Sequence, residues 1–210
     1  MNTKTIIIFV AVILGLLGGV GALLTQFGQS SEDPIVDIAG EKKHVKGPST
    51  SSGQGLVTLV EFSDFQCPAC LSVQAPLEQI LKKYEGKIEF IYRHFPLTTI
   101  HKNAQLASQA AEAAGLQDKF WQMHDKLFVA QSEWSALGDP KEKFVNYAAE
   151  IGLDKDKFVN QLESQEVKDM VAVDILAATR YRLTGTPTFF VNGIKTEFGQ
   201  LEDRIAVLAK

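Results

Sequence analysis

The segment VEFSDFQCPACLSVQ, residues 60–74, contains both cysteines of the 210-residue chain, separated by only two residues. A disulfide between Cys67 and Cys70 would close a very small ring, which removes little entropy from the unfolded chain and so adds little stability. The pair is therefore better suited to chemistry at sulfur than to a structural role.

The residues around the pair predict a strand, a helix and a second strand. The apolar run LVTLVEF at 56–62 is typical of a buried strand. A helix is expected to begin at Pro68, because proline is well tolerated at the first helical position, and to stop at Gly86. The alternating run KIEFIYRHF at 87–95 predicts the second strand.

The remainder of the chain predicts a helical block and then a second β-containing half. Helical patterns fill residues from about 100 to 183. After them, TFFV and IKTE flank Asn192 and Gly193, a pair typical of a hairpin turn. A final helix is expected over LEDRIAVLAK, residues 201–210. The order β-α-β, helices, β-β-α indicates an α/β fold with a helical insertion.

With these features the sequence resembles the DsbA-like thiol–disulfide oxidoreductases of the thioredoxin-fold superfamily, and is similar to their membrane-anchored subgroup. The resemblance covers residues 56–210 and rests on C-P-x-C at a helix start and on Thr186-Pro187 before a hairpin. The stretches YRHFPL, HKNAQLASQAAEAAGLQDKFWQMHDKLF and GTPTFFVNG add to it. It implies a thioredoxin fold with the insertion, about 100–183, between its two halves.

The resemblance also implies a role for each site residue. Cys67 corresponds to the family's nucleophile and Cys70 to its resolving cysteine, and together they would form the redox-active disulfide. Thr186-Pro187 corresponds to the cis-proline loop, and Glu61 to the buried acid that serves the second cysteine as proton acceptor. The strongest oxidants of the family carry histidine where this chain has Ala69, so we expect a less extreme potential.

The chemistry of thiol exchange gives a physical reason for these positions. The attacking species is a thiolate, and a free cysteine has a pKa of about 8.5. The positive end of a helix starting at Pro68 would lower the pKa of Cys67 by about one unit. Hydrogen bonds from backbone N–H groups and the Cys70 thiol must supply the rest. We expect an ionised, reachable Cys67 sulfur and a potential between about −270 and −120 mV, nearer the oxidising end.

Other polar residues receive structural expectations. Because Glu61 alternates with Val60 and Phe62, it should face away from them, either buried as a proton relay or exposed on an edge strand. Asp64 is expected in an exposed loop. Pro187, in a tight loop before the hairpin, is expected to follow a cis bond.

The four histidines show no spacing that predicts a metal site. His44 is expected to be exposed in a linker, and His94, His101 and His124 to have core or surface roles. The aromatic stripe of Phe120, Trp121 and Phe128 is interpreted as helix packing. We therefore predict neither a metal nor a cofactor.

The N-terminal region predicts export. Thr5 to Leu24 is a run of twenty uncharged residues, long enough as a helix to cross about 30 Å of hydrocarbon. We interpret residues 1–24 as a transmembrane anchor, with a cleaved signal segment as the alternative, and place the remainder outside the cytoplasm. Residues 25–55, rich in Gly, Ser, Pro and charge, predict a flexible tether, and 56–210 the catalytic domain.

These inferences predict a membrane-tethered, extracytoplasmic enzyme that introduces disulfides into reduced, unfolded exported proteins, as a monomer. A membrane or soluble thiol oxidant would reoxidise it. The net charge of −4 gives no sign of nucleic-acid binding. The alternatives are a disulfide reductase or isomerase, a metal-binding module that uses the two thiolates, and a binding domain with an inert disulfide.

Overall fold

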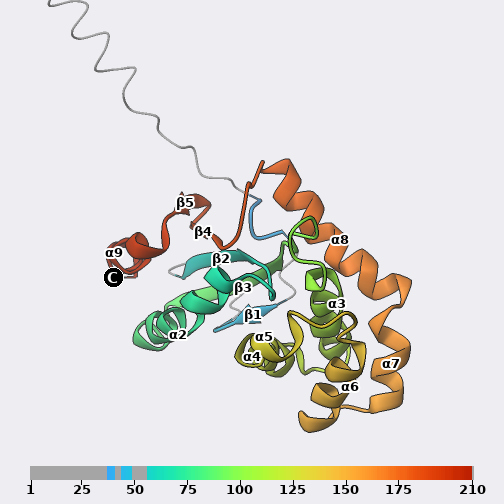
Figure 1. The fold of residues 1–210 in the computed structure, drawn as a ribbon. Helices are drawn as coiled ribbons and strands as arrows, with labels where there is room; N and C mark the ends of the chain where they lie inside the picture. The colour runs from blue at the N-terminus through green and yellow to red at the C-terminus, as the bar shows by residue number, and fades with distance from the viewer. Residues whose placement is uncertain (1–36, 41–43, 49–55, 210) are drawn as a thin grey trace, which may run out of the picture. The chain divides into compact units, whose positions relative to one another are not determined.

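A computed structural model describes residues 37–40, 44–48 and 56–209 of the chain. In this part of the chain, five strands form one sheet in the order β1-β3-β2-β4-β5 (Figure 1). The strands are β1 (Val45–Lys46), β2 (Val57–Ser63), β3 (Ile88–His94), β4 (Thr188–Val191) and β5 (Ile194–Thr196). Strands β2 and β3 are parallel, and the other neighbouring pairs are antiparallel.

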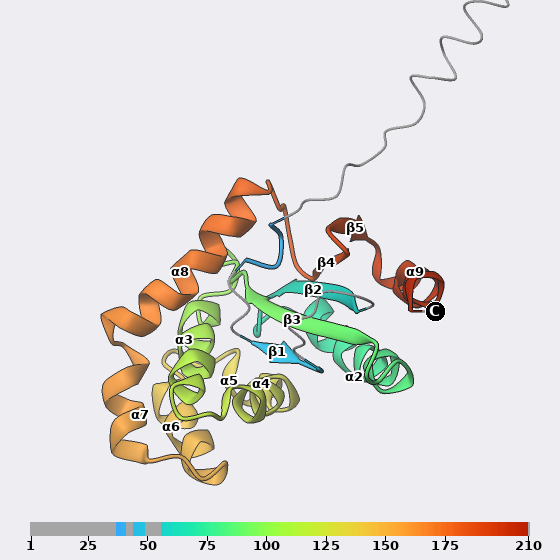
Figure 2. The ribbon, with the colours of Figure 1, turned by 180° about the vertical axis from the view of Figure 1, so that it is seen from behind.

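The helices divide into two groups. Helix α2 (Pro68–Lys83) joins β2 to β3, and α9 (Leu201–Leu208) follows β5 through a short 3-10 turn at Phe198–Gln200. The second group lies between β3 and β4: α3 (Ala104–Gly115), α4 (Phe120–Val129), α5 (Gln131–Trp134), α6 (Lys141–Glu150), α7 (Lys155–Leu162) and α8 (Gln165–Arg180). Figures 1 and 2 show this second group together at one side of the sheet. The expected α/β fold with a helical insertion at about 100–183 is confirmed.

The two faces of the sheet bury different residues, because successive side chains of a strand point to opposite faces. Leu59 of β2 and Phe90 of β3 pack with Leu77 of α2 in one apolar cluster. Val60 and Phe62 lie in another cluster, with Ala178 of α8. Glu61 alternates with Val60 and Phe62, so its side chain lies on the α2 side of the sheet.

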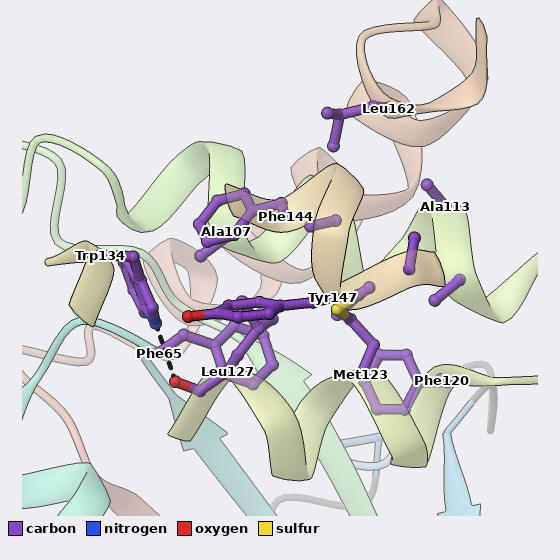
Figure 3. Close-up of a cluster of buried hydrophobic side chains, with 14 of the residues drawn as sticks. Phe65, Ala107, Ala113, Phe120, Met123, Leu127, Trp134, Phe144, Tyr147 and Leu162 are labelled. Carbon is purple, nitrogen blue, oxygen red and sulfur yellow. Dashed lines mark hydrogen bonds between the residues drawn. The ribbon is translucent and has the colours of Figure 1, made fainter. Parts of the chain in front are cut away.

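The insertion has an apolar core of its own, which Figure 3 shows. The aromatic stripe expected from the sequence contributes Phe120 and Phe128 to it, both almost completely buried. Trp134 is fully buried and its Nε1–H donates to the carbonyl oxygen of Leu127 at 2.9 Å. Phe65, two residues before the first cysteine, is also part of this cluster. The cysteine loop and the insertion therefore share one core.

The predicted boundary between tether and domain is wrong. Strand β1 lies within the predicted tether of 25–55, yet it pairs with β3. Ile38 is buried in the sheet's second cluster, and His44, expected to be exposed, is only 7 % exposed. A two-residue strand between polar stretches carries no periodicity, so the sequence pattern did not reveal it.

The predicted membrane segment, 1–24, lies outside the described residues. Among the residues that the structure does describe, none of the helices combines the length and apolar character needed to cross a bilayer.

Candidate active site

Cys67 occupies the N-cap position of α2, as the sequence predicted. Its backbone is extended, with φ −75° and ψ 122°, and Pro68 begins the helix. No acidic side chain lies in the first turn of α2. The sulfur therefore lies at the end of a helix whose free N–H groups favour negative charge.

The surroundings of the two sulfurs separate their pKa values strongly. A hydrogen bond from the Cys70 thiol, aided by the backbone N–H groups of Cys70 and Ala69, lowers the pKa of Cys67 to about 5 against the opposing effect of burial. Burial, and then the same bond to Cys67, raises the pKa of Cys70 far above its usual value. At neutral pH, Cys67 is a thiolate and Cys70 a thiol.

Access to the sulfurs is narrower than the sequence led us to expect. Both cysteines are free thiols; Cys67 is 7 % exposed and Cys70 is fully buried. The Cys67 Sγ atom lies 3.6 Å from the carbonyl oxygen of Thr186, which precedes the cis Thr186-Pro187 bond. Thr186 therefore lies against the Cys67 sulfur, which is almost completely buried. A surface pocket lined by Thr184, Gly185, Thr186, Pro187, Thr188 and Phe189 and by residues 195–198 flanks the loop.

Glu61 is fully buried and hydrogen-bonds to Gln74 of α2. Burial raises the pKa of Glu61 to about 7, although hydrogen bonds with Ser63 and Gln74 oppose the shift. Gln74 Nε2 donates to Glu61 Oε1 at 3.2 Å and to the Cys70 carbonyl oxygen at 3.1 Å. The carboxyl group therefore titrates near neutral pH and connects to the backbone of the resolving cysteine through one side chain.

Comparison with known proteins identifies the family of the chain. The sequence profile of the family described as Thioredoxin matches residues 45–206. The chain belongs to the thioredoxin family.

Two solved structures share the fold of the chain. BdbD from Bacillus subtilis, in an oxidised crystal structure, superposes with a TM-score of 0.68 at 22 % identity, covering 79 % of this chain and 91 % of that one. The thiol–disulfide exchange protein alpha-DsbA2 from Wolbachia pipientis gives 0.66 at 22 %, covering 82 % and 90 %. The chain thus has a thioredoxin fold with a helical insertion, as in DsbA structures.

A curated relative is longer. The Na(+)/H(+) antiporter NhaA 3 of Salinispora tropica is 38 % identical over 161 residues, which are 77 % of this chain and 23 % of the relative. The thioredoxin-family chain thus spans about a quarter of that protein's length.

Asp64 was expected in an exposed loop, and that prediction is wrong. Its side chain is fully buried. Asp64 Oδ2 accepts hydrogen bonds from the Leu97 N–H at 2.9 Å and from His101 Nδ1 at 2.7 Å, while Oδ1 accepts from the Gln66 N–H. The loop before Cys67 is held by these bonds, whose distant partners lie after β3.

Two glutamines that the sequence did not single out also fix this loop. Gln131 Nε2, from the insertion, donates to the carbonyl oxygens of Phe65 at 2.8 Å and Cys67 at 3.1 Å. Gln66 donates to the Ser135 carbonyl oxygen and accepts from the Asn103 N–H. Isolated glutamines in helical or loop patterns carry no local signal of such contacts. In this thioredoxin-family chain, residues of the insertion thus hold the backbone around Cys67.

The expectation that no histidines converge is also wrong. His44 and His94 both approach Glu112 of α3, and the ligand atoms of the three residues lie within 4.8 Å of one another. These residues are separated by long stretches of sequence, so spacing did not predict the cluster. Neither cysteine belongs to this cluster.

Proposed function

We propose that the chain is a thiol–disulfide oxidoreductase that introduces disulfide bonds into reduced, unfolded exported proteins. The observation that carries the proposal is the opposite displacement of the two cysteine pKa values at the start of α2. Membership of the thioredoxin family and the fold seen in DsbA structures support it.

In the proposed reaction the enzyme begins with a Cys67–Cys70 disulfide. A substrate thiolate attacks the Cys67 sulfur, forming a mixed disulfide, and Cys70 leaves as a thiolate and takes up a proton. A second substrate thiolate then attacks the substrate sulfur of the mixed disulfide, and Cys67 leaves as a stable thiolate. Two electrons pass from substrate to enzyme, and one disulfide forms in the substrate.

Glu61 is the proposed source of the proton for Cys70. Its pKa of about 7 leaves it partly protonated under neutral conditions, so it can both give and take a proton. The hydrogen bonds of Gln74 to Glu61 Oε1 and to the Cys70 carbonyl oxygen support this assignment.

The low pKa of Cys67 favours an oxidising enzyme. A stabilised thiolate stabilises the reduced form, and about 1.4 kcal/mol of such stabilisation corresponds to about 30 mV. Reductase or isomerase action is the rival direction within the same chemistry. Equilibration with glutathione separates them: we expect a potential above about −240 mV, and a lower value would support the reductase.

The use of the cysteines as a metal-binding module is less well supported. In the described part of the chain, the cluster of three close metal-ligand groups consists of His44, His94 and Glu112 and includes neither cysteine. The names of the antiporter relatives describe proteins of which the chain matches only 23 %, and ion transport is not part of the proposal.

The proposal includes a location and partners. Residues 1–24 would anchor the chain, with the folded domain outside the cytoplasm. A thiol oxidant in the membrane or in solution would restore the Cys67–Cys70 disulfide. We expect the chain to act as a monomer without nucleic acid.

Oxidative refolding of a reduced, unfolded secreted protein tests the proposed activity. The oxidised chain should accelerate disulfide formation, and Cys67→Ser should abolish the acceleration. Cys70→Ser, the matched variant, cannot form the Cys67–Cys70 disulfide that takes up the two electrons, so it should abolish the acceleration as well. If the wild type and Cys67→Ser refold the substrate at indistinguishable rates, the oxidase assignment is refuted.

A further inference from the structure

The buried cluster of His44, His94 and Glu112 brings together metal-ligand groups that take no part in the proposed reaction of the cysteine pair. We propose that these three side chains form a binding site for one zinc ion, separate from the redox site. The three side chains converge, are buried and have unpaired polar atoms around them, and a metal held there would be independent of the proposed thiol chemistry.

The three ligands come from three different parts of the fold. His44 immediately precedes β1, His94 ends β3, and Glu112 lies in the last turn of α3. His44 Nε2 lies 2.8 Å from Glu112 Oε1, and His94 Nε2 lies 3.1 Å from the same oxygen. Two imidazole nitrogens thus lie at hydrogen-bonding distance from one carboxylate oxygen, and the ligand atoms of the three residues lie within 4.8 Å of one another.

The distances require little adjustment to hold a metal. Zinc binds histidine nitrogen and carboxylate oxygen at about 2.0–2.2 Å, so tetrahedral ligand atoms lie about 3.3 Å apart. The two nitrogen–oxygen distances, 2.8 and 3.1 Å, are shorter than that spacing by about 0.2–0.5 Å, so the ligands would have to move slightly apart around an ion. Nitrogen donors favour zinc over calcium or magnesium, which prefer oxygen.

Unpaired polar atoms around the cluster are the second observation. His94 Nδ1 and Glu112 Oε2 are buried and have no hydrogen-bond partner among the described residues. Ser108 Oγ has none there either, and Ser108 lies four residues before Glu112, on the same face of α3. Buried polar groups are nearly always paired, so this cluster has capacity for a further ligand. Glu112 Oε2 and Ser108 Oγ are candidates to complete the coordination.

The surroundings point to a structural site. His94 is fully buried and Glu112 is 1 % exposed. The ring of His44 stacks on that of Phe120, with centroids 3.4 Å apart. An ion held there would join the segment before β1, the sheet and the insertion, without an open coordination position for substrate.

Metal titration of the full chain tests the site, provided that the two thiols are first removed as competing ligands. In the Cys67→Ser/Cys70→Ser background, unfolded protein is refolded with Zn²⁺ or Co²⁺, because the cluster is enclosed. We expect one tightly bound equivalent after dialysis, a Co²⁺ spectrum of nitrogen and oxygen ligands, and a higher thermal midpoint with metal than with chelator.

Two variants should remove the site. Glu112→Gln and His44→Gln are each expected to weaken binding at least tenfold and to abolish the thermal shift. His44→Gln guards against a folding defect, because His44 lies outside the helices and the long strands. His101→Gln, which disrupts the pair between His101 and the buried Asp64, should retain one equivalent.

The outcomes are decisive in both directions. If the background protein binds no metal, or if Glu112→Gln and His44→Gln bind it as the background does, the proposal is overturned and the three residues form a hydrogen-bonded clamp only. Loss of the metal in His101→Gln, with retention in both cluster variants, would overturn it as well.

Discussion

The burial of Glu61 affects both its acid–base behaviour and the stability of the fold, because burial raises the pKa of its carboxyl group. The side chain lies on a central strand, between the cysteine helix and the sheet, and Ser63 and Gln74 offset only part of its desolvation. A carboxyl group with a pKa near 7 suits proton exchange at neutral pH. The same shift means that the folded protein resists ionisation of this group.

The variant Glu61→Gln should therefore be more stable than the wild type at high pH only. The folded-state pKa of about 7 lies above the ordinary 4.5, so wild-type stability falls as pH rises from about 4.5 to 7. The shift corresponds to about 3 kcal/mol above pH 7. Urea unfolding of both proteins at pH 4 and pH 8 measures it. An equal difference at both pH values would contradict the raised pKa.

The positions of individual site residues could be predicted where a short sequence motif determines them. The cysteine pair, Pro68 at the helix start and the cis Thr186-Pro187 bond followed from short motifs. The burial of Asp64 and His44 did not, because their partners lie far away in sequence. Asp64 pairs with His101, and His44 with Glu112. One sequence does not reveal such pairings.

At the scale of the element, the first turn of α2 controls the thiolate. The Cys70 thiol, then the N–H groups of this turn and its lack of acidic side chains, favour negative charge on Cys67. Ala69 is exposed in that turn, so a side chain can be changed there without disturbing the core.

Replacing Ala69 with glutamate should raise the pKa of Cys67. A negative charge near the thiolate disfavours ionisation, by about 0.3–1 kcal/mol at an exposed position, or up to about one pKa unit. Alkylation of Cys67 with iodoacetamide across pH 4–8 measures the shift. The isosteric control Ala69→Gln should leave the pKa close to that of the wild type. Equal shifts in both variants would show that charge is not the cause.

Elements with strong periodicity were predicted well, and short ones were not. The strands at β2 and β3, helix α2 and the hairpin of β4 and β5 agree with the sequence patterns. Strand β1 has only two residues and the sequence pattern did not predict it. The predicted start of the domain, residue 56, is therefore too late in the chain. Its place in the sheet depends on pairing with β3, which is a tertiary contact.

At the scale of the whole molecule, the insertion supports the redox loop. Phe65 packs into the core of the insertion, and Gln131 hydrogen-bonds to the carbonyl oxygens on both sides of Gln66. The sequence predicted that an insertion exists, but not which of its residues contact the loop. Those contacts depend on how the helices pack.

Removing the Gln131 side chain should destabilise the protein. Gln131→Ala leaves two buried carbonyl groups without this donor, which costs about 1–3 kcal/mol. Urea unfolding at pH 7 measures the loss. Gln165→Ala, which removes an exposed side chain bonded to Asp169, should change stability by no more than about 0.5 kcal/mol. Similar values for the two variants would show that Gln131 does not hold the loop.

The Cys67 sulfur is expected to be ionised at neutral pH, and the ultraviolet absorbance of the thiolate measures this ionisation most directly. In the reduced protein we predict one transition with a midpoint at about pH 5, absent from Cys67→Ser. A midpoint at the value of an unperturbed cysteine, about 8.5, would contradict the account.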